Sequence, residues 1–382
     1  MKTNRYNTFL ILILSFLFFH NICFAQNDVI SLKEANISKK KKRTLQYEEL
    51  KKMPRIGLYS FGYTIYDDKL YIMSGDISET NITDFSSDIY TFDFVQNKWI
   101  TQKAKTSKVA GNYIFTYNNF IYSLGGRKLE KNSSKVYLNN TIDIYDIKND
   151  SLFSRQPMPH QAANFAAIKA NDNIILFGGS TKISETGKKT YSDKVTFFDL
   201  KTGLWYDLAP MPTAKETTGI LVGNKVYLIG GYKDQALKTI ETYDLTTGTW
   251  QNEFELPTAL ENPTLASKNG IIYMYEQGAF YTYDTSNKHF KEYIIQNITA
   301  SNSKIVIYKN DLYLLGGCNI SIGENPLKPK PINLEMGIPD GFVMDWQTKY
   351  ISTIDNVYKI SLSYFNTTIP KVSLSKNNLN IN

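Results

Sequence analysis

The chain has 382 residues, of which 42% are hydrophobic and 21% charged, so it can bury a sizeable core and is neither disordered nor collagen-like. Its 27 Tyr and 21 Phe fit pleated, half-buried surfaces better than helices and predict an all-β fold. The formal charge of +7 is a mild excess of basic residues. With only 2 Cys and 3 His, a disulfide framework or a Cys/His metal cluster is nearly excluded, and we expect neither a metal nor a cofactor.

Residues 1–25 have the pattern of a secretory signal peptide. Lys2 and Arg5 precede an apolar stretch too short to span a bilayer core of about 30 Å, and a small residue, Ala25, ends the segment. We expect cleavage after Ala25 and a secreted, periplasmic or cell-surface chain with no transmembrane segment. A lipoprotein anchored through Cys23 is the alternative, but the residues before this cysteine are too polar and too large for a good lipobox.

Residues 26–44 form a basic N-terminal arm, because Lys39–Lys42 and Arg43 make the one dense charge run of the chain. A solvated, flexible arm and attachment to an anionic surface or polymer both fit this run. Basic residues are otherwise spread evenly in a chain that we expect to be exported, which argues against a nucleic-acid partner.

A strand-like run that ends in two small residues recurs along the rest of the chain. The copies lie at 67–75, 118–126, 171–179, 223–231, 268–276 and 309–317. Each begins with an Asn, Asp or Gly turn and continues in β-branched and aromatic residues, as a tight hairpin feeding a buried strand does. The spacing close to 50 residues, with one shortened copy, predicts six repeats.

A second pattern follows five of these runs: an aromatic residue, then Asp, then a bulky apolar residue six positions past the Asp. The copies lie at 92–99, 145–152, 198–205, 243–250 and 283–290. The Asp suits a turn in which a carboxylate caps backbone amides, and the bulky residue would pack between neighbouring sheets.

The two patterns together resemble the kelch motif over about residues 45–361. The residues that carry the motif are glycines and tryptophans: Gly75, Gly125, Gly126, Gly178, Gly179, Gly230, Gly231, Gly316, Gly317, Trp99, Trp205 and Trp250. The resemblance implies a six-bladed β-propeller, in which each repeat forms a four-stranded sheet and the sheets surround a channel. Ser74 replaces one glycine, Leu152 replaces one tryptophan, and the run at 268–276 has no Gly pair, so blade five is the least regular.

The two chain ends are predicted to meet in blade six. Residues 47–54 repeat the spacing of 205–212, so the N-terminal segment is expected to supply the outermost strand of that blade. Residues 355–361 align with 193–199, which makes them its third strand after an insertion at 318–354. Residues 362–382 form a C-terminal tail or, alternatively, the closing strand.

Loops at one end of the channel are the predicted binding face, since long loops on a rigid scaffold commonly carry function. They include 127–140, 180–193 and the insertion 318–354, for which a cap over the channel is the alternative. The candidate ligand-binding residues form a cationic rim with stacking tyrosines: Arg55, Arg127, His160, Tyr137, Tyr191 and Tyr232. The alternative is that Arg55 and His160 bond between blades and that the loop lysines Lys128, Lys182, Lys188 and Lys233 are solvated.

No catalytic motif stands out, and the catalytic residues are unknown. His160 and His289 are too few for a copper radical oxidase, and a sialidase arginine triad has no match. We predict an exported, non-catalytic kelch propeller whose loop face binds an unidentified protein or glycan, and an anionic ligand would fit the rim. The resemblance leaves one enzymatic alternative, a sugar-anomer mutarotase or epimerase of the sialic acid mutarotase type, with Glu130 or Glu185 acting beside Arg55.

Overall fold

The computed structural model describes residues 42–55, 57–80, 82–129, 135–183, 188–324 and 347–365. The chain divides into two units, Met1–Lys42 and Arg43–Asn382, and the second unit holds every strand described below. Within the described residues the one helical element is the 3-10 turn η1 (Leu362–Tyr364), so the all-β prediction is confirmed. The described residues contain no helix that is long and apolar enough to cross a membrane. The predicted signal peptide and most of the basic arm lie outside the described residues.

Six sheets of four or five strands, antiparallel apart from one edge pairing, follow one another along the described chain, and we number them blade one to blade six. Blade one comprises β3 (Gly62–Tyr66), β4 (Lys69–Met73), β5 (Ile89–Asp93) and β6 (Lys98–Thr101). Blade two comprises β8 (Tyr113–Tyr117), β9 (Phe120–Leu124), β12 (Thr141–Asp146) and β13 (Ser151–Pro157). Blade three comprises β14 (Ala166–Ala170), β15 (Asn173–Phe177), β18 (Val195–Asp199) and β19 (Trp205–Leu208).

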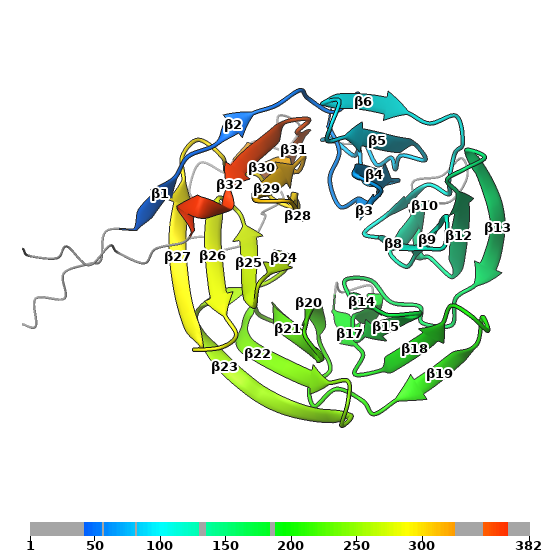
Figure 1. Ribbon diagram of the computed structural model, residues 1–382, viewed down its shortest axis with the longest axis vertical. Coiled ribbons are helices and arrows are strands. Elements are labelled where there is room, and N and C mark those ends of the chain that lie inside the picture. The colour runs from blue at the N-terminus through cyan, green and yellow to red at the C-terminus, as the bar shows by residue number, and fades with distance from the viewer. Residues whose placement is uncertain are drawn as a thin grey trace, which may run out of the picture. The chain divides into compact units, whose positions relative to one another are not determined.

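Blades four to six complete the series. Blade four comprises β20 (Glu216–Val222), β21 (Lys225–Tyr232), β22 (Leu237–Asp244) and β23 (Thr249–Leu260). Blade five comprises β24 (Thr264–Lys268), β25 (Ile271–Glu276), β26 (Ala279–Asp284), β27 (His289–Ile295) and β1 (Arg43–Leu45). Blade six comprises β28 (Lys304–Tyr308), β29 (Asp311–Leu315), β32 (Val357–Ser361) and β2 (Glu48–Glu49). Figure 1 shows these sheets around a common centre, with β3, β8, β14, β20, β24 and β28 innermost.

The second small residue of the repeated pair joins one blade to the next. The amide of Gly75 donates to the carbonyl of Val109 at 2.8 Å, and Gly317 donates to Leu58 at 2.9 Å. The Gly317 bond links blade six to the segment that enters blade one. Gly317 has a φ of 112°, and a Cβ there would lie 2.3 Å from the Ser303 side chain, so the close approach requires glycine.

The aspartates of the second repeated pattern cap the outer turns, as the spacing predicts. Asp93 Oδ1 accepts the amides of Val95 and Gln96 at 2.9 and 2.8 Å, and Asp146, Asp199 and Asp244 each do the same in their own blades. The bulky residue then packs between sheets: Trp99 is 8% exposed, and its indole nitrogen donates to the Lys51 carbonyl at 3.0 Å. The turns therefore position the tryptophans against neighbouring segments.

The N-terminal segment lies along two blades. In blade six, β2 pairs antiparallel with β32, and the amides of Leu50 and Met53 extend the pairing to the Val357 and Asp355 carbonyls. In blade five, β1 pairs parallel with β27, a contact that the sequence analysis missed. Arg43 and Thr44 therefore belong to the propeller rather than to the arm, because backbone pairing and the buried Leu45 hold them there.

The C-terminal boundary also differs from the prediction. Phe365 is buried, and its ring packs against Tyr273, Phe280 and Tyr293 of blade five. The propeller thus extends to residue 365 instead of ending at 361. Residues 362–364 form η1 rather than a closing strand, and 366–382 lie outside the described residues.

Candidate functional site

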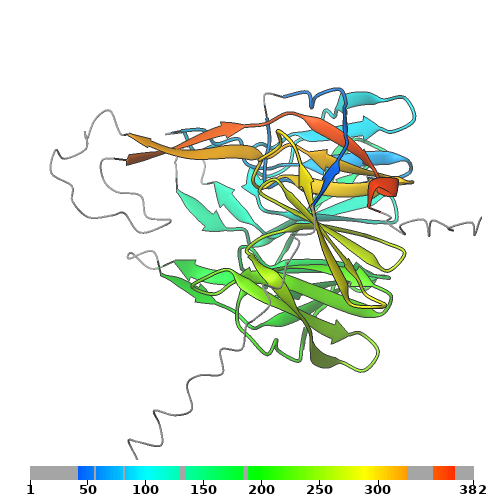
Figure 2. The same cartoon turned by 90° about the vertical axis from the view of Figure 1, so that its left-hand side faces the viewer.

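Three hairpin structures extend the loops between the second and third strands of blades two, three and six. They are β10 (Arg127–Leu129) with β11 (Val136–Leu138), β16 (Ser180–Ile183) with β17 (Lys189–Tyr191), and β30 (Cys318–Glu324) with β31 (Gln347–Thr353). In the first of them, β10 also pairs with β7 (Val109–Ala110). Figure 2 shows all three projecting from the same end of the ring, with β30 and β31 in orange and red-orange. We call these three hairpins the crown.

The insertion at 318–354 is thus a long hairpin in its described part. Its register runs from Cys318 opposite Thr353 to Glu324 opposite Gln347, and residues 325–346 lie outside the described residues. The hairpin is held to blade one because the amide of Ile351 donates to Thr80 Oγ1 at 3.0 Å. This anchorage fixes the described part of the insertion at the rim of the ring.

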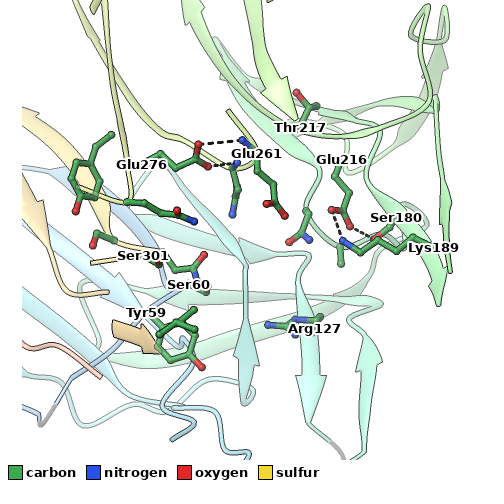
Figure 3. Close-up of a pocket in the computed structure, with 18 of the residues that line it drawn as sticks. Tyr59, Ser60, Arg127, Ser180, Lys189, Glu216, Thr217, Glu261, Glu276 and Ser301 are labelled. Carbon is green, nitrogen blue, oxygen red and sulfur yellow. Dashed lines mark hydrogen bonds and ion pairs between the residues drawn. The ribbon is translucent and has the colours of Figure 1, made fainter. Parts of the chain in front are cut away.

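A polar cavity of about 440 Å³ lies at the crown end of the ring. Its wall includes the starts of the innermost strands and the short segments that lead into them, with Ser60, Asn164, Thr217, Asn262 and Asn302 from five blades. The crown adds Arg127, Ser180, Lys189, Ile320 and Lys349. Figure 3 shows Ser60, Arg127 and Thr217 on different sides of the cavity, which is therefore built from segments far apart in the sequence.

Charges of both signs line the cavity. The cations are Arg127, Lys189 and Lys349, and the carboxylates are Glu216, Glu261 and Glu276. These formal charges balance, so the cavity lacks the cationic bias expected for the rim. A neutral polar or mixed-charge ligand matches such a lining better than a strongly anionic one.

Glu216 and Lys189 form the most constrained ion pair of the cavity. Lys189 Nζ lies 2.8 Å from Glu216 Oε2, and Glu216 Oε1 accepts a hydrogen bond from Ser180 Oγ at 2.6 Å. The Glu216 side chain is 5% exposed, so the pair is largely shielded from water. Arg127 is held less tightly, with Nη2 3.5 Å from Asp76 Oδ2 and half of its side chain exposed.

Glu276 is the carboxylate best placed for proton exchange. It ends β25, and its two oxygens accept the backbone amides of Glu261 and Asn262 at 3.2 and 2.6 Å. Burial raises the pKa of Glu276 above its ordinary value, although these two hydrogen bonds oppose the change. Glu276 therefore has both a fixed orientation and a perturbed carboxyl group in the cavity.

Arg55 and His160, two of the residues predicted to bind a ligand, are not part of the cavity lining. The His160 ring is buried, its Nε2 lies 3.1 Å from the Gly178 carbonyl, and its Nδ1 lies 3.0 Å from Thr196 Oγ1. Because a carbonyl only accepts, Nε2 donates and Nδ1 accepts in the neutral ring. Burial lowers the pKa of His160 to about 4, so the ring stays neutral near pH 7 and links blade two to blade three.

Arg55 likewise makes a contact between blades. Its Nη1 lies 3.4 Å from Asp88 Oδ2, and the same carboxylate binds Lys105 at 2.6 Å. Both Arg55 and His160 therefore bond between blades, which is the alternative that the sequence analysis gave for them. Arg127 is the one member of the predicted six that lines the cavity.

The three predicted tyrosines lie on or beside the crown. Tyr137 is half exposed on β11. Tyr191 and Tyr232 have ring centroids 6.4 Å apart, and the Lys189 ammonium lies 4.8 Å above the Tyr232 ring. They flank Lys189 without lining the cavity, and the Tyr191 hydroxyl is already occupied by the amide of Asp234 at 3.0 Å. Glu130 and Glu185, the acid–base candidates, lie outside the described residues.

The sequence analysis missed Glu216, Lys189, Lys349 and Glu276. A signal for Glu276 was present, because Tyr275 and Glu276 occupy the place of the small-residue pair in the run at 268–276. The chain turns instead at Gln277 and Gly278, whose φ angles are 46° and 86°. Where the other blades have glycine, blade five therefore directs a carboxylate into the cavity.

Comparisons with known proteins agree on the fold. Beta-scruin from Limulus polyphemus is 25% identical over 188 residues, 48% of this chain and 20% of that protein. Kelch-like protein 40 from Xenopus tropicalis is 26% identical over 242 residues, 62% of this chain and 38% of that protein, so the chain spans well under half the length of these relatives.

The solved structure of YjhT superimposes with a TM-score of 0.54 at 15% identity, covering 70% of this chain and 92% of that chain. At this identity the likeness concerns the fold alone. The model of the Attractin/LZTR1 beta-propeller family matches residues 34–240, more than half of the chain. Together with the glycine pairs and aspartate turns described above, this match shows that the chain is a kelch-repeat propeller and belongs to the Attractin/LZTR1 beta-propeller family.

Proposed function

We propose that the protein is an exported, non-catalytic binding module that holds a partner protein on its crown. The observation that carries the proposal is the apolar surface of two of the three crown hairpins, β10 with β11 and β30 with β31. Its exposed large apolar side chains are Val136, Tyr137, Ile320, Ile322 and Tyr350. The signal-peptide pattern of residues 1–25 supports export.

The hairpin of β30 and β31 has an exposed apolar side chain on each face, because Tyr350 pairs with Ser321 and lies on the face opposite to Ile320 and Ile322. Ile320 and Ile322 are two residues apart on one strand and therefore share a face of the hairpin. Ile320 and Lys349 line the polar cavity, so this face overhangs the cavity mouth. Protein interfaces combine buried apolar contacts with polar contacts around them. An apolar hairpin face beside a polar cavity offers both kinds of contact to a protein partner.

A triple substitution on the crown is expected to abolish partner retention. Replacing Tyr137, Ile322 and Tyr350 by Ser should weaken binding by at least about tenfold, because each apolar anchor at an interface contributes about 1 kcal/mol or more. The measurement is quantitative capture by immobilised residues 26–382 from the secreted or periplasmic fraction of the source cells.

The matched control replaces three exposed apolar residues outside the crown, Val95, Phe153 and Leu204, by Ser. It should retain the same proteins as the unmodified chain. Equal retention by the crown variant and by the control would overturn the proposal, provided that both melt at the same temperature as the unmodified protein.

A second candidate function, the exchange of sugar anomers, is favoured by the Glu276 carboxyl in the polar cavity. Anomer exchange needs a group that both gives and takes a proton at the sugar, and a carboxyl with a raised pKa meets this demand. The hydrogen-bonding groups around it, such as Asn164, Asn262 and Asn302, match the hydroxyls of a sugar.

For this candidate, Glu276→Gln should slow anomer exchange by about 100-fold, the usual contribution of a positioned acid–base group. Magnetisation transfer between the anomers of sialic acid and of neutral sugars measures the rate. Glu261→Gln, which alters an exposed carboxylate of the same cavity, is the control and should keep most of the activity. If the unmodified protein gives no acceleration, the candidate fails.

A further inference from the structure

A second cavity of about 400 Å³ lies among the innermost strands of the blades. Every blade contributes to it, and most of its lining is apolar. The apolar lining includes Tyr63, Ile114, Ile168, Ile220, Leu265 and Val306. This channel cavity is therefore distinct in chemistry from the polar cavity at the crown.

Lys304 is exceptional among these neighbours. It is the first residue of β28, directly after Ser303, which lines the polar cavity. Lys304 lines the channel cavity and retains only an intermediate exposure. Throughout the described chain, no hydrogen bond or ion pair to the Lys304 ammonium is found, and the channel lining includes no carboxylate.

Other titratable groups do not compensate this ammonium. The lining also holds Lys169, a second cation, and two phenols, Tyr63 and Tyr113, whose pKa values are raised by burial so that they remain neutral near pH 7. Burial alone lowers the pKa of Lys304 to about 8, and at pH 7 most molecules therefore still carry the charge.

A cation held in an apolar cavity without a counter-ion destabilises the fold, which is why buried charges in proteins are normally paired. Neither the channel lining nor the described surroundings of Lys304 offer the missing anion. A ligand that brings its own anion would remove this penalty and would at the same time bury apolar surface in the channel.

We propose that the channel binds a carboxylate with an apolar body, of the medium-chain fatty acid type, with the carboxylate on the Lys304 ammonium and the chain along the inner strands. The charge of the lining selects the anion, since both charged side chains in it are lysines. The cavity volume accommodates an aliphatic chain of this class. This inference does not depend on the crown or on Glu276.

Calorimetric titration of residues 26–382 with octanoate at pH 7 tests the proposal. Octanoate should bind, whereas 1-octanol, which lacks the charge, and acetate, which lacks the tail, should bind at least about tenfold more weakly. Lys304→Met should lower octanoate affinity by about tenfold or more, because a hydrogen bond to a charged group is lost. Lys98→Met, which changes an exposed lysine on β6, is the matched control and should bind like the unmodified protein.

A stability measurement separates loss of the ligand contact from loss of the fold. Because the pKa of Lys304 lies below its ordinary value of 10.5, the folded protein holds fewer protons than the unfolded chain between about pH 8 and 10.5. The free energy of unfolding of the unmodified protein should therefore rise with pH in this window relative to Lys304→Met. Without ligand, Lys304→Met should be at least as stable as the unmodified protein at pH 7.

Three results would overturn the proposal: no octanoate binding, equal binding of 1-octanol, or equal octanoate affinity in a folded Lys304→Met protein. The crown variant should keep its octanoate affinity, so failure here and failure of the proposed partner binding are distinguishable. Acidic-sugar binding that is unchanged in Lys304→Met, without octanoate binding, would place the anion in the polar cavity and would also count against the channel.

Discussion

Gly231→Ala is expected to lower the free energy of unfolding by about 3 kcal/mol or more, since a side chain at this φ adds backbone strain of about 1–3 kcal/mol to a steric clash. Gly231 has a φ of 112°, and a Cβ there would lie 2.1 Å from the Glu216 carbonyl oxygen. The atom in the way belongs to the backbone, so no side-chain rotation relieves the clash. The end of β21 must move away from the start of β20, where Glu216 enters the polar cavity.

Gly223→Ala is the matched control for this substitution. Gly223 also has a positive φ, 59°, but no heavy atom lies within 4 Å of the position of a Cβ. The Gly223→Ala variant should lose about 1 kcal/mol of unfolding free energy, which is the penalty of the backbone conformation alone. Urea unfolding of the two variants and the unmodified protein gives the comparison. If both variants lose a similar amount of unfolding free energy, the close approach of Gly231 to the Glu216 carbonyl does not require glycine at this position.

The second large effect is expected from removal of the N-terminal segment that lies along blades five and six. Deletion through Pro54 removes β1, β2 and the buried side chains of Leu45 and Met53, which are 1% and 5% exposed. Losing each such side chain costs about 2–5 kcal/mol, against a total stability of about 5–15 kcal/mol for a domain. The deletion also removes the Lys51 carbonyl that accepts the Trp99 indole and exposes the outer edge of β32.

We therefore expect the protein shortened through Pro54 to unfold or aggregate at 25 °C, whereas deletion through Lys42 should leave the melting temperature unchanged. Deletion through Gln46, which removes β1 but keeps β2, should give an intermediate melting temperature. Differential scanning calorimetry with size-exclusion chromatography measures these effects. A monomeric, cooperatively folded protein after deletion through Pro54 would show that pairing of β2 with β32 is dispensable.

The sequence alone determined the features that depend on short stretches of chain. The strand runs, the small-residue pairs and the aspartate turns each occupy fewer than ten residues, and their chemistry dictates hairpins wherever they occur. Repetition of these hairpins at a spacing near 50 residues predicted six repeats, and the resemblance to the kelch motif implied that the repeats form a propeller. The spacing shared by residues 47–54 and 205–212 also directed the N-terminal segment to the blade where β2 lies.

The candidate sites needed the tertiary structure, for a physical reason. Arg127, Glu216 and Glu276 come from blades two, four and five, and only closure of the ring brings them to one cavity. Sequence reasoning selected Arg127 from its loop but also selected His160, whose burial against Gly178 makes it a link between blades. The charge state of Lys304 likewise depends on burial among strands far apart in the chain, and no local pattern records that environment.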